Sequence, residues 1–207
     1  MFTAENLISD TSYCCYVIRK FVAIRYSYLV LLQGKNLQLR ALEPQDLDLL
    51  YTWENNPDVW AVSGTLTPFS RFIIEQYLTI SHQDIYTSKE LRLMIDLGSS
   101  DESKTKTIGC VDLFDFDPKN KKAGIGILIG DESKRRKGFA AEAVEIVIEY
   151  CFTTLDLHQV YCSVIGNNQD SLALFRKLNF ETTGTRKDWI YNQGQFVDEY
   201  FLQFIRR

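Results

Sequence analysis

The sequence predicts an α/β protein built on one twisted, mixed sheet with helices on both faces. Short apolar segments with the alternation typical of strands are interspersed with longer segments that show helical periodicity. The chain has 207 residues and 45% hydrophobic content, which is enough for one domain with a substantial core. The order read from these patterns is strand, two helices, three strands, helix, strand, helix and two strands.

The first half of the chain supplies the first strands and two helices. Residues 37–42 alternate apolar and polar side chains, as a half-buried strand does. Pro44-Gln-Asp46 begins a helix with Leu47, Leu50 and Tyr51 on one face, since proline is favoured in the first helical turn. The elements expected here are a strand at 37–42, the helix opened by Pro44, a loop at 59–68, a helix at 69–82, and strands at 91–97 and 107–114.

The second half alternates strands and helices before it closes in a hairpin. After Gly138, the apolar residues Val144, Ile148, Cys151 and Leu155 share one helical face, so this helix is expected to pack on one side and to be solvated on the other. The elements expected here are a strand at 123–129, the helix after Gly138, a strand at 159–164, a helix at 169–178, and strands at 185–191 and 196–205 around a turn at 192–194.

A basic turn joins the strand at 123–129 to the following helix, and it predicts an anion-binding site. Backbone N–H groups in the first turn of a helix have no intrahelical partner and lie at the positive end of the helix dipole. Small side chains let a bulky anion approach that backbone closely. An ordinary solvated turn is the alternative. The residues expected to contribute are Arg135, Arg136, Lys137, Gly138, Phe139, Ala140 and Ala141.

Two segments resemble motifs of one enzyme family. Arg135-x-x-Gly138-x-Ala140 resembles the acetyl-CoA-binding motif Arg/Gln-x-x-Gly-x-Gly/Ala of the GNAT N-acetyltransferases. The segment from Val164 to Phe180, a strand followed by a helix that begins Asn-x-x-Ser, is similar to the second cofactor element of that family. The resemblance extends from about Asn36 to Ile205, so a GNAT domain is expected over 34–207. Residues 1–33 are then an N-terminal extension, either an additional strand or helix or residues ahead of the natural start.

The resemblance implies the GNAT fold and acetyl-CoA as the cofactor. In this family the pantetheine arm adds to the sheet through main-chain hydrogen bonds, and the pyrophosphate lies on the basic turn. The cofactor site would then include the strand residues Ile127, Leu128 and Ile129, the turn from Arg135 to Ala141, and the helix residues Asn168, Ser171 and Phe175. Asn168 would also act as the N-cap of its helix, a purely structural role that is compatible with binding.

The chain departs from its relatives at two proton-transfer positions. Many GNAT proteins carry a glutamate where this chain has Gly124, and the spermidine N-acetyltransferases carry a tyrosine acid where it has Phe175. Among the remaining acids, Asp115 aligns with a polyamine-contacting position of the spermidine enzymes, although it could equally be a solvated carboxylate at a strand end. Other candidate groups near the expected cleft are Asp96, Asp112, Asp117, Tyr161, Tyr191 and Tyr200. Without an acid, the thiolate can leave unaided because its conjugate acid has a pKa of only about 8.5.

The function expected from the resemblance is acetyl transfer from acetyl-CoA to a primary amine, by direct attack in a ternary complex. The acceptor is expected to be a polyamine or another small amine. A second candidate is a protein N-terminus, because the segment from Asn56 to Trp60 resembles that of the ribosomal-protein alanine N-acetyltransferases. A third is a non-catalytic acyl-CoA-binding module, which the replacements at Gly124 and Phe175 would favour.

Composition argues against several other functions and types of site. A net charge of −4 argues against a nucleic-acid binder, which usually presents a dominant basic face. Five cysteines without ligand spacing, and only two histidines, indicate reduced thiols of a cytoplasmic protein and no metal site. No apolar run approaches the roughly 20 residues of a membrane span. Imperfect alternation of apolar residues in the final hairpin suggests a homodimer.

Overall fold

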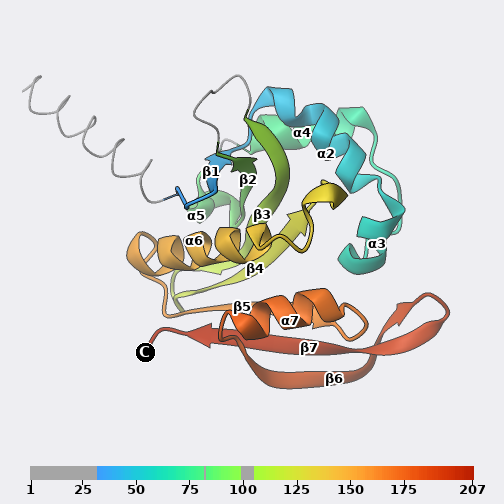
Figure 1. The fold of residues 1–207 in the computed structure, drawn as a ribbon, viewed down its shortest axis with the longest axis vertical. Coiled ribbons are helices and arrows are strands. Elements are labelled where there is room, and N and C mark those ends of the chain that lie inside the picture. The colour runs from blue at the N-terminus through green and yellow to red at the C-terminus, as the bar shows by residue number, and fades with distance from the viewer. Residues whose placement is uncertain (1–31, 82, 99–104) are drawn as a thin grey trace, which may run out of the picture.

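The structure is a computed structural model that describes residues 32–81, 83–98 and 105–207. Nearly all of the predicted extension at 1–33 lies outside the described residues. Within them, seven strands form one mixed sheet in the order β1-β2-β3-β4-β5-β7-β6 (Figure 1). The strands are β1 (Leu37–Ala41), β2 (Leu91–Leu97), β3 (Lys106–Asp117), β4 (Lys122–Ile129), β5 (Gln159–Ile165), β6 (Glu181–Asn192) and β7 (Gln195–Ile205).

Helices cover both faces of this sheet, as expected. Adjacent residues of a strand point to opposite faces, and on β3 Cys110 packs with Leu50 of α2 and Ile74 of α4, whereas Val111 packs in the cluster that contains Val144 of α6. The helices are η1 (Pro44–Asp46), α2 (Leu47–Glu54), α3 (Pro57–Ser63), α4 (Arg71–Ile80), α5 (Ile85–Ser88), η3 (Glu132–Lys134), α6 (Phe139–Thr153) and α7 (Gln169–Lys177).

Three local predictions were wrong. The expected loop at 59–68 is helical in its first part, because Asn56 caps α3 by accepting a hydrogen bond from the Asp58 N–H and Gly64 ends it in a left-handed conformation. The short helix α5, capped by Asp84, was not predicted. The strand β6 begins at Glu181 rather than 185, since its pairing with β7 extends that far along the chain.

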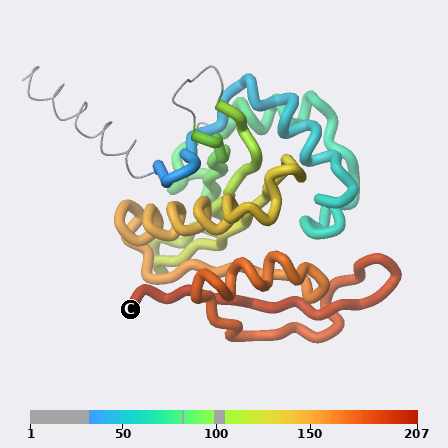
Figure 2. The backbone as a smooth tube through the Cα atoms, in the orientation of Figure 1, coloured from blue at the N-terminus to red at the C-terminus, as the bar shows by residue number. Residues whose placement is uncertain are grey.

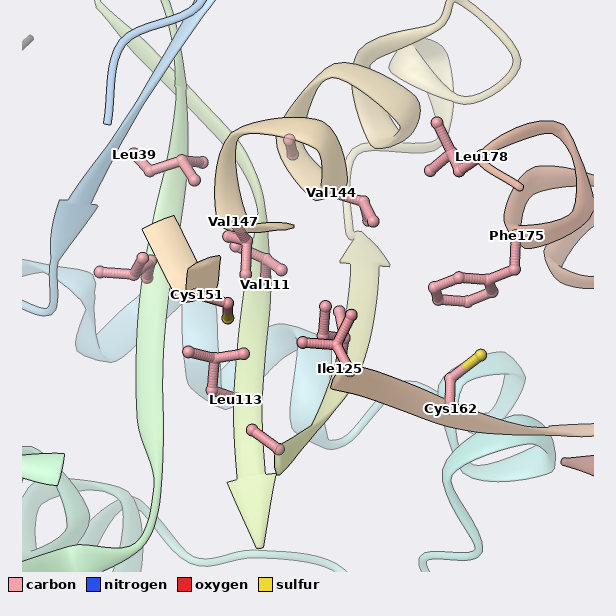
Figure 3. Close-up of a cluster of buried hydrophobic side chains, with 14 of the residues drawn as sticks. Leu39, Val111, Leu113, Ile125, Val144, Val147, Cys151, Cys162, Phe175 and Leu178 are labelled. Atoms are coloured by element: carbon pink, nitrogen blue, oxygen red, sulfur yellow. The ribbon is translucent and has the colours of Figure 1, made fainter. Parts of the chain in front are cut away.

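The main core lies between the sheet and the helices α6 and α7. Figure 3 shows part of it, with side chains of both helices pointing toward those of the strands. Cys151 of α6 and Cys162 of β5 lie in this core, while Cys110 faces the smaller cluster under α2 and α4, and all three are free thiols, as predicted. Burial raises the pKa of Cys151 and of Cys162 to about 12, so both remain protonated at neutral pH.

A charged network joins the first strands to the start of α2. The Arg40 guanidinium donates to Asp96 at 2.7 Å and to both carboxylate oxygens of Asp46 at 2.7 and 2.8 Å. The side chains of Asp46 and Asp96 are only 2% and 5% exposed. Their bonds and charges raise the pKa of Arg40 above its usual range despite the opposing effect of its burial. Asp96, one of the acids considered near the cleft, is therefore a structural group.

The sheet opens between its two parallel strands. β4 and β5 pair only through Lys122↔Gln159, Ala123↔Val160 and Gly124↔Tyr161, although both strands continue beyond these pairs. Over its remaining length β4 stays paired with β3, and β5 with β7. The two backbone traces separate toward α7 in Figure 2. One edge of β4 is thus free of strand partners from Ile125 to Ile129.

Replacing Arg40 should destabilise the fold strongly. The change Arg40→Met leaves two buried carboxylates without a cation, which costs about 3–5 kcal/mol of unfolding free energy. The matched control Arg71→Met breaks a pair with Asp48 in which both side chains are more than half exposed, and it should cost less than about 1 kcal/mol. Urea denaturation measures both values. Equal losses for the two variants would contradict the structural role given to Arg40.

Candidate active site

A cleft of about 230 Å³ lies where β4 and β5 separate. Five residues expected at the cofactor site contribute to its wall: Ile127, Leu128, Asn168, Ser171 and Phe175. Ile129, the remaining predicted strand residue, is 9% exposed and packs in the main core. The free edge of β4 gives the cleft unpaired backbone groups, which can bind an extended ligand as an added strand would.

The basic turn lies at the end of β4, ahead of α6. Arg135 folds back and donates from Nε to the carbonyl of Ile129 at 3.0 Å. Gly138 is the N-cap residue of α6, with φ of 87° and no side-chain cap, so the amides of the first turn keep their donors free. A Cβ at Gly138 would have no neighbour within 4 Å. The turn therefore offers open space in front of uncapped amides, as an anion site requires.

The other residues of this turn divide into charged and packed groups. Arg136 also has positive φ and bonds to Asp170 in the first turn of α7 at 3.0 and 3.2 Å, in an ion pair whose side chains are both exposed. Lys137 is exposed. Three side chains pack against the main core, so that they can reach an anion only through their backbone: Phe139, Ala140 and Ala141.

The start of α7 forms the opposite wall of the cleft. Asn168 caps this helix, as predicted, by accepting a hydrogen bond from the Ser171 N–H at 3.1 Å. Phe175 is 2% exposed and its ring packs edge-on against Phe180, with centroids 5.0 Å apart. Phe175 therefore shapes the cleft without any group that could exchange a proton.

A neighbouring aromatic ring leaves no room for a side chain at Gly124. A Cβ at this position would lie 2.2 Å from Cε2 of Phe114 on the adjacent strand. The Phe114 ring in turn packs edge-on against Tyr161, which packs against Phe201. An aromatic row on this face of the sheet thus occupies the space where many relatives carry a glutamate.

Asp115 does not line the cleft. It lies at the bulge of β3 with φ of 49°, is exposed, and accepts a hydrogen bond from the Tyr161 hydroxyl at 3.1 Å. Burial, followed by this bond, raises the pKa of Tyr161 to about 12, which keeps the hydroxyl protonated. Since Tyr161 is in the last β4–β5 pair, Asp115 lies at the closed end of the opening, apart from the residues that form the cleft wall.

Three charged residues of the cleft wall form a cluster that sequence reasoning did not assemble. Arg92 donates to the two oxygens of Asp112 at 2.7 and 3.0 Å and to Glu54 at 2.6 Å. Burial acts to lower the pKa of Arg92, but the charge of Asp112 and its hydrogen bond raise it well above the ordinary value. Asp112 was among the acids considered, whereas Glu54 and Arg92 were missed. The sequence did contain one signal for Arg92. It lies two residues before Met94 in β2 and therefore on the same face of the strand, which packs under α2 and α4.

A wider groove adjoins the cleft. It has a volume of about 600 Å³ and lies between α3, the residues after it, and the β6–β7 hairpin. Asn192 ties its two sides together by donating to the carbonyl of Ala61 at 2.7 Å. Tyr191 lines this groove, whereas Tyr200 packs against the main core. The cleft and the groove adjoin each other, because four residues line both of them: Val62, Ser63, Ser163 and Ile165.

Two further findings concern the described residues only. No cluster of three or more histidine, cysteine or acidic side chains in them could hold a metal ion. No helix among them has the length and apolar character needed to span a membrane.

Known proteins share this fold and are 23–29% identical in sequence. An uncharacterized N-acetyltransferase, p20 of Bacillus licheniformis, is 29% identical over 177 residues, which make up 85% of this chain and 96% of the relative. The spermidine N(1)-acetyltransferase of Vibrio cholerae is 25% identical over 165 residues, or 80% of this chain and 90% of that protein. A crystal structure of the spermidine N-acetyltransferase from Vibrio cholerae with CoA and spermine has a TM-score of 0.74 at 23% identity, covering 83% and 96% of the two chains, and shows the same fold.

The family assignment follows from the extent of the match. The acetyltransferase (GNAT) domain matches residues 36–181, a range that includes β1 to β5, both walls of the cleft and the uncapped turn ahead of α6. The chain thus belongs to the GNAT family, and it is an N-acetyltransferase that uses acetyl-CoA as its acetyl donor.

Proposed function

We propose that the chain transfers the acetyl group directly to the primary amine of a polyamine or another small amine, with donor and acceptor bound together. The observation that carries this proposal is that the cleft and the groove adjoin and share four lining residues. The donor would occupy the cleft and the uncapped turn, and the acceptor would enter from the groove. The two molecules would then meet beside the free edge of β4, and the acetyl group would pass directly from donor to acceptor without being bound covalently to the protein.

The donor would be held largely by backbone groups. We assign its pantetheine arm to the free edge formed by Ile127, Leu128 and Ile129 and its pyrophosphate to the turn from Arg135 to Ala141. The uncapped amides after Gly138 supply donors for the phosphate oxygens. On the other wall, Asn168, Ser171 and Phe175 would contact the arm near its sulfur. These assignments agree with the cleft lined by Ile127 and Leu128 and with the uncapped amides after Gly138.

Direct transfer also agrees with the chemistry of the cleft wall. Cys110, its one thiol among the described residues, is almost fully buried, and burial raises the pKa of its thiol far above neutral pH. It would therefore be a poor nucleophile for an acetyl-enzyme intermediate. In direct transfer the ammonium first loses one proton to water, and the neutral amine then forms the new C–N bond. The C–S bond breaks, its electron pair leaves with sulfur, and the acylated nitrogen releases its second proton to water. Because Gly124 and Phe175 provide no acid, the thiolate would leave unaided, which its pKa of about 8.5 permits.

The acceptor class is supported by the similar proteins and by the groove. Spermidine N(1)-acetyltransferase is among the relatives, which favours a small aliphatic amine. A protein N-terminus is the second candidate, because the groove is wide and has strongly exposed apolar residues at its rim, including Leu66 at 90% and Tyr191 at 67% exposure. The rest of a protein substrate could pack against this rim while its N-terminal amine enters the cleft.

Amine-dependent release of CoA thiol tests this function. With acetyl-CoA and a panel of spermidine, simple alkylamines and peptides with free N-termini, we expect release that requires an amine. Mass spectrometry of the protein incubated with acetyl-CoA alone should show no covalent acetylation, since no activated nucleophile lines the cleft. Binding of acetyl-CoA without turnover on any amine would contradict the proposed function, and an acetylated protein that passes its acetyl group to an amine would contradict direct transfer.

Replacing Gly138 should weaken donor binding selectively. The change Gly138→Glu puts a carboxylate in front of the amides proposed for the pyrophosphate, and we expect about a tenfold or greater loss of CoA affinity by calorimetry. The control Gly194→Glu is closely matched, because Gly194 also has positive φ (86°) and no atom within 4 Å of a built Cβ. Both variants strain the backbone, but only the first should change binding. Equal effects on affinity would argue against the turn as the pyrophosphate site.

A further inference from the structure

We infer that the acceptor is a primary amine with a single ammonium group and an apolar substituent, the ammonium bound by Glu54 and the substituent lying in the groove. This inference rests on the proposed function and narrows its substrate class. It separates monoamines from polyamines, which carry several ammonium groups. Three observations support it: the unused oxygen of Glu54, the charge balance of the cleft, and the apolar character of the groove.

Glu54 offers a carboxylate oxygen to the cleft. Arg92 donates only to Oε1 of Glu54, and no described residue donates to Oε2. Asp112, by contrast, uses both oxygens to hold Arg92. Glu54 ends α2, and the indole N–H of Trp60, a groove residue, donates to its backbone carbonyl, which ties the end of α2 to α3. A primary ammonium has three donors and can bind the remaining oxygen.

The charge balance of the cleft matches one ammonium. Its charged wall residues are Glu54, Asp112 and Arg92, which leave one net negative charge. The groove adds no further uncompensated carboxylate among the described residues, because Glu199 is paired with Arg186. A second ammonium on the acceptor would therefore lose part of its hydration without a free carboxylate to replace it, which costs free energy.

Gly126 leaves room for the amine beside this cluster. It lies opposite Asp112 in the β3–β4 pairing, on the free half of β4. A Cβ at this position would have its nearest neighbours at 3.8 Å, so a side chain would fit and would project into the space beside Asp112. That space is open here, unlike the crowded site at Gly124, and it joins the carboxylates to the free edge where the donor would lie.

The groove supplies an apolar surface for the rest of the acceptor. Its lining includes Trp60, Val62, Leu66, Ile190 and Tyr191. Leu66 is 90% exposed and Val62 is 47% exposed, so both present apolar surface that a substituent could cover. Covering such apolar surface stabilises a complex through the hydrophobic effect. An alkyl or aryl substituent would gain this energy, whereas a charged chain would not.

The decisive comparison is between hexylamine and 1,6-diaminohexane, which differ only in the second amino group. At pH 7 and constant ionic strength, we expect kcat/KM for hexylamine to exceed that for the diamine and for spermidine by about tenfold, a difference of about 1.4 kcal/mol. Equal or better turnover of the diamine or spermidine would overturn the inference while leaving the proposed function intact. If no amine is acetylated although CoA binds, the proposed function and this inference both fail.

Two variants test the site itself. Glu54→Gln keeps an acceptor for Arg92 but removes the charge, so KM for hexylamine should rise about tenfold with a smaller change in kcat and unchanged CoA affinity. The control is Glu75→Gln, an exposed glutamate on α4 that lines neither hollow. Leu66→Ser, at an exposed position where folding is not at risk, should raise KM for hexylamine but not for methylamine. Kinetics of Glu54→Gln and Leu66→Ser that match those of Glu75→Gln would overturn the inference.

Discussion

The separation of β4 from β5 after the Gly124–Tyr161 pair is the constraint on which the site depends. Because each strand keeps its other neighbour, the opening leaves a row of unpaired backbone groups in the middle of an otherwise continuous sheet. Polar backbone groups in such a place need a partner. An extended ligand arm can supply one, and the uncapped start of α6 lies where the charged end of that ligand would fall. The donor site that we propose is thus made mainly of backbone groups.

Because the proposed donor site is formed by short, continuous segments of backbone, much of it could be predicted from the sequence. The motif from Arg135 to Ala140 and the Asn-x-x-Ser segment are local patterns, and in the structure they form the turn ahead of α6 and the start of α7. Most strands were also predicted to within a few residues, including β2 at its observed bounds. Alternation and capping act over short distances along the chain, so a single sequence reveals them.

The acceptor side was less predictable because it is assembled from distant segments. Glu54, Arg92 and Asp112 come from α2, β2 and β3 and meet only when the helix lies over the sheet. The helix α3, one wall of the groove, was missed although Asn56-Pro57 and Gly64 are good helix boundaries. Asp115, chosen by alignment, bonds instead to Tyr161 at the closed end of the opening. Alignment gave its position along the strand but not the bulge or the bond to Tyr161, both of which depend on neighbouring strands.

The most direct test of the central claim is amide hydrogen exchange with and without saturating CoA. If the donor adds to the free edge of β4 and to the start of α6, exchange should slow in peptides covering 126–129 and 138–141, and stay unchanged in β1 and β2. A second hollow of about 450 Å³, lined by Phe152, Arg206 and the ends of β6 and β7, lies elsewhere in the described part of the protein. Protection there, with none at β4 and α6, would contradict the account.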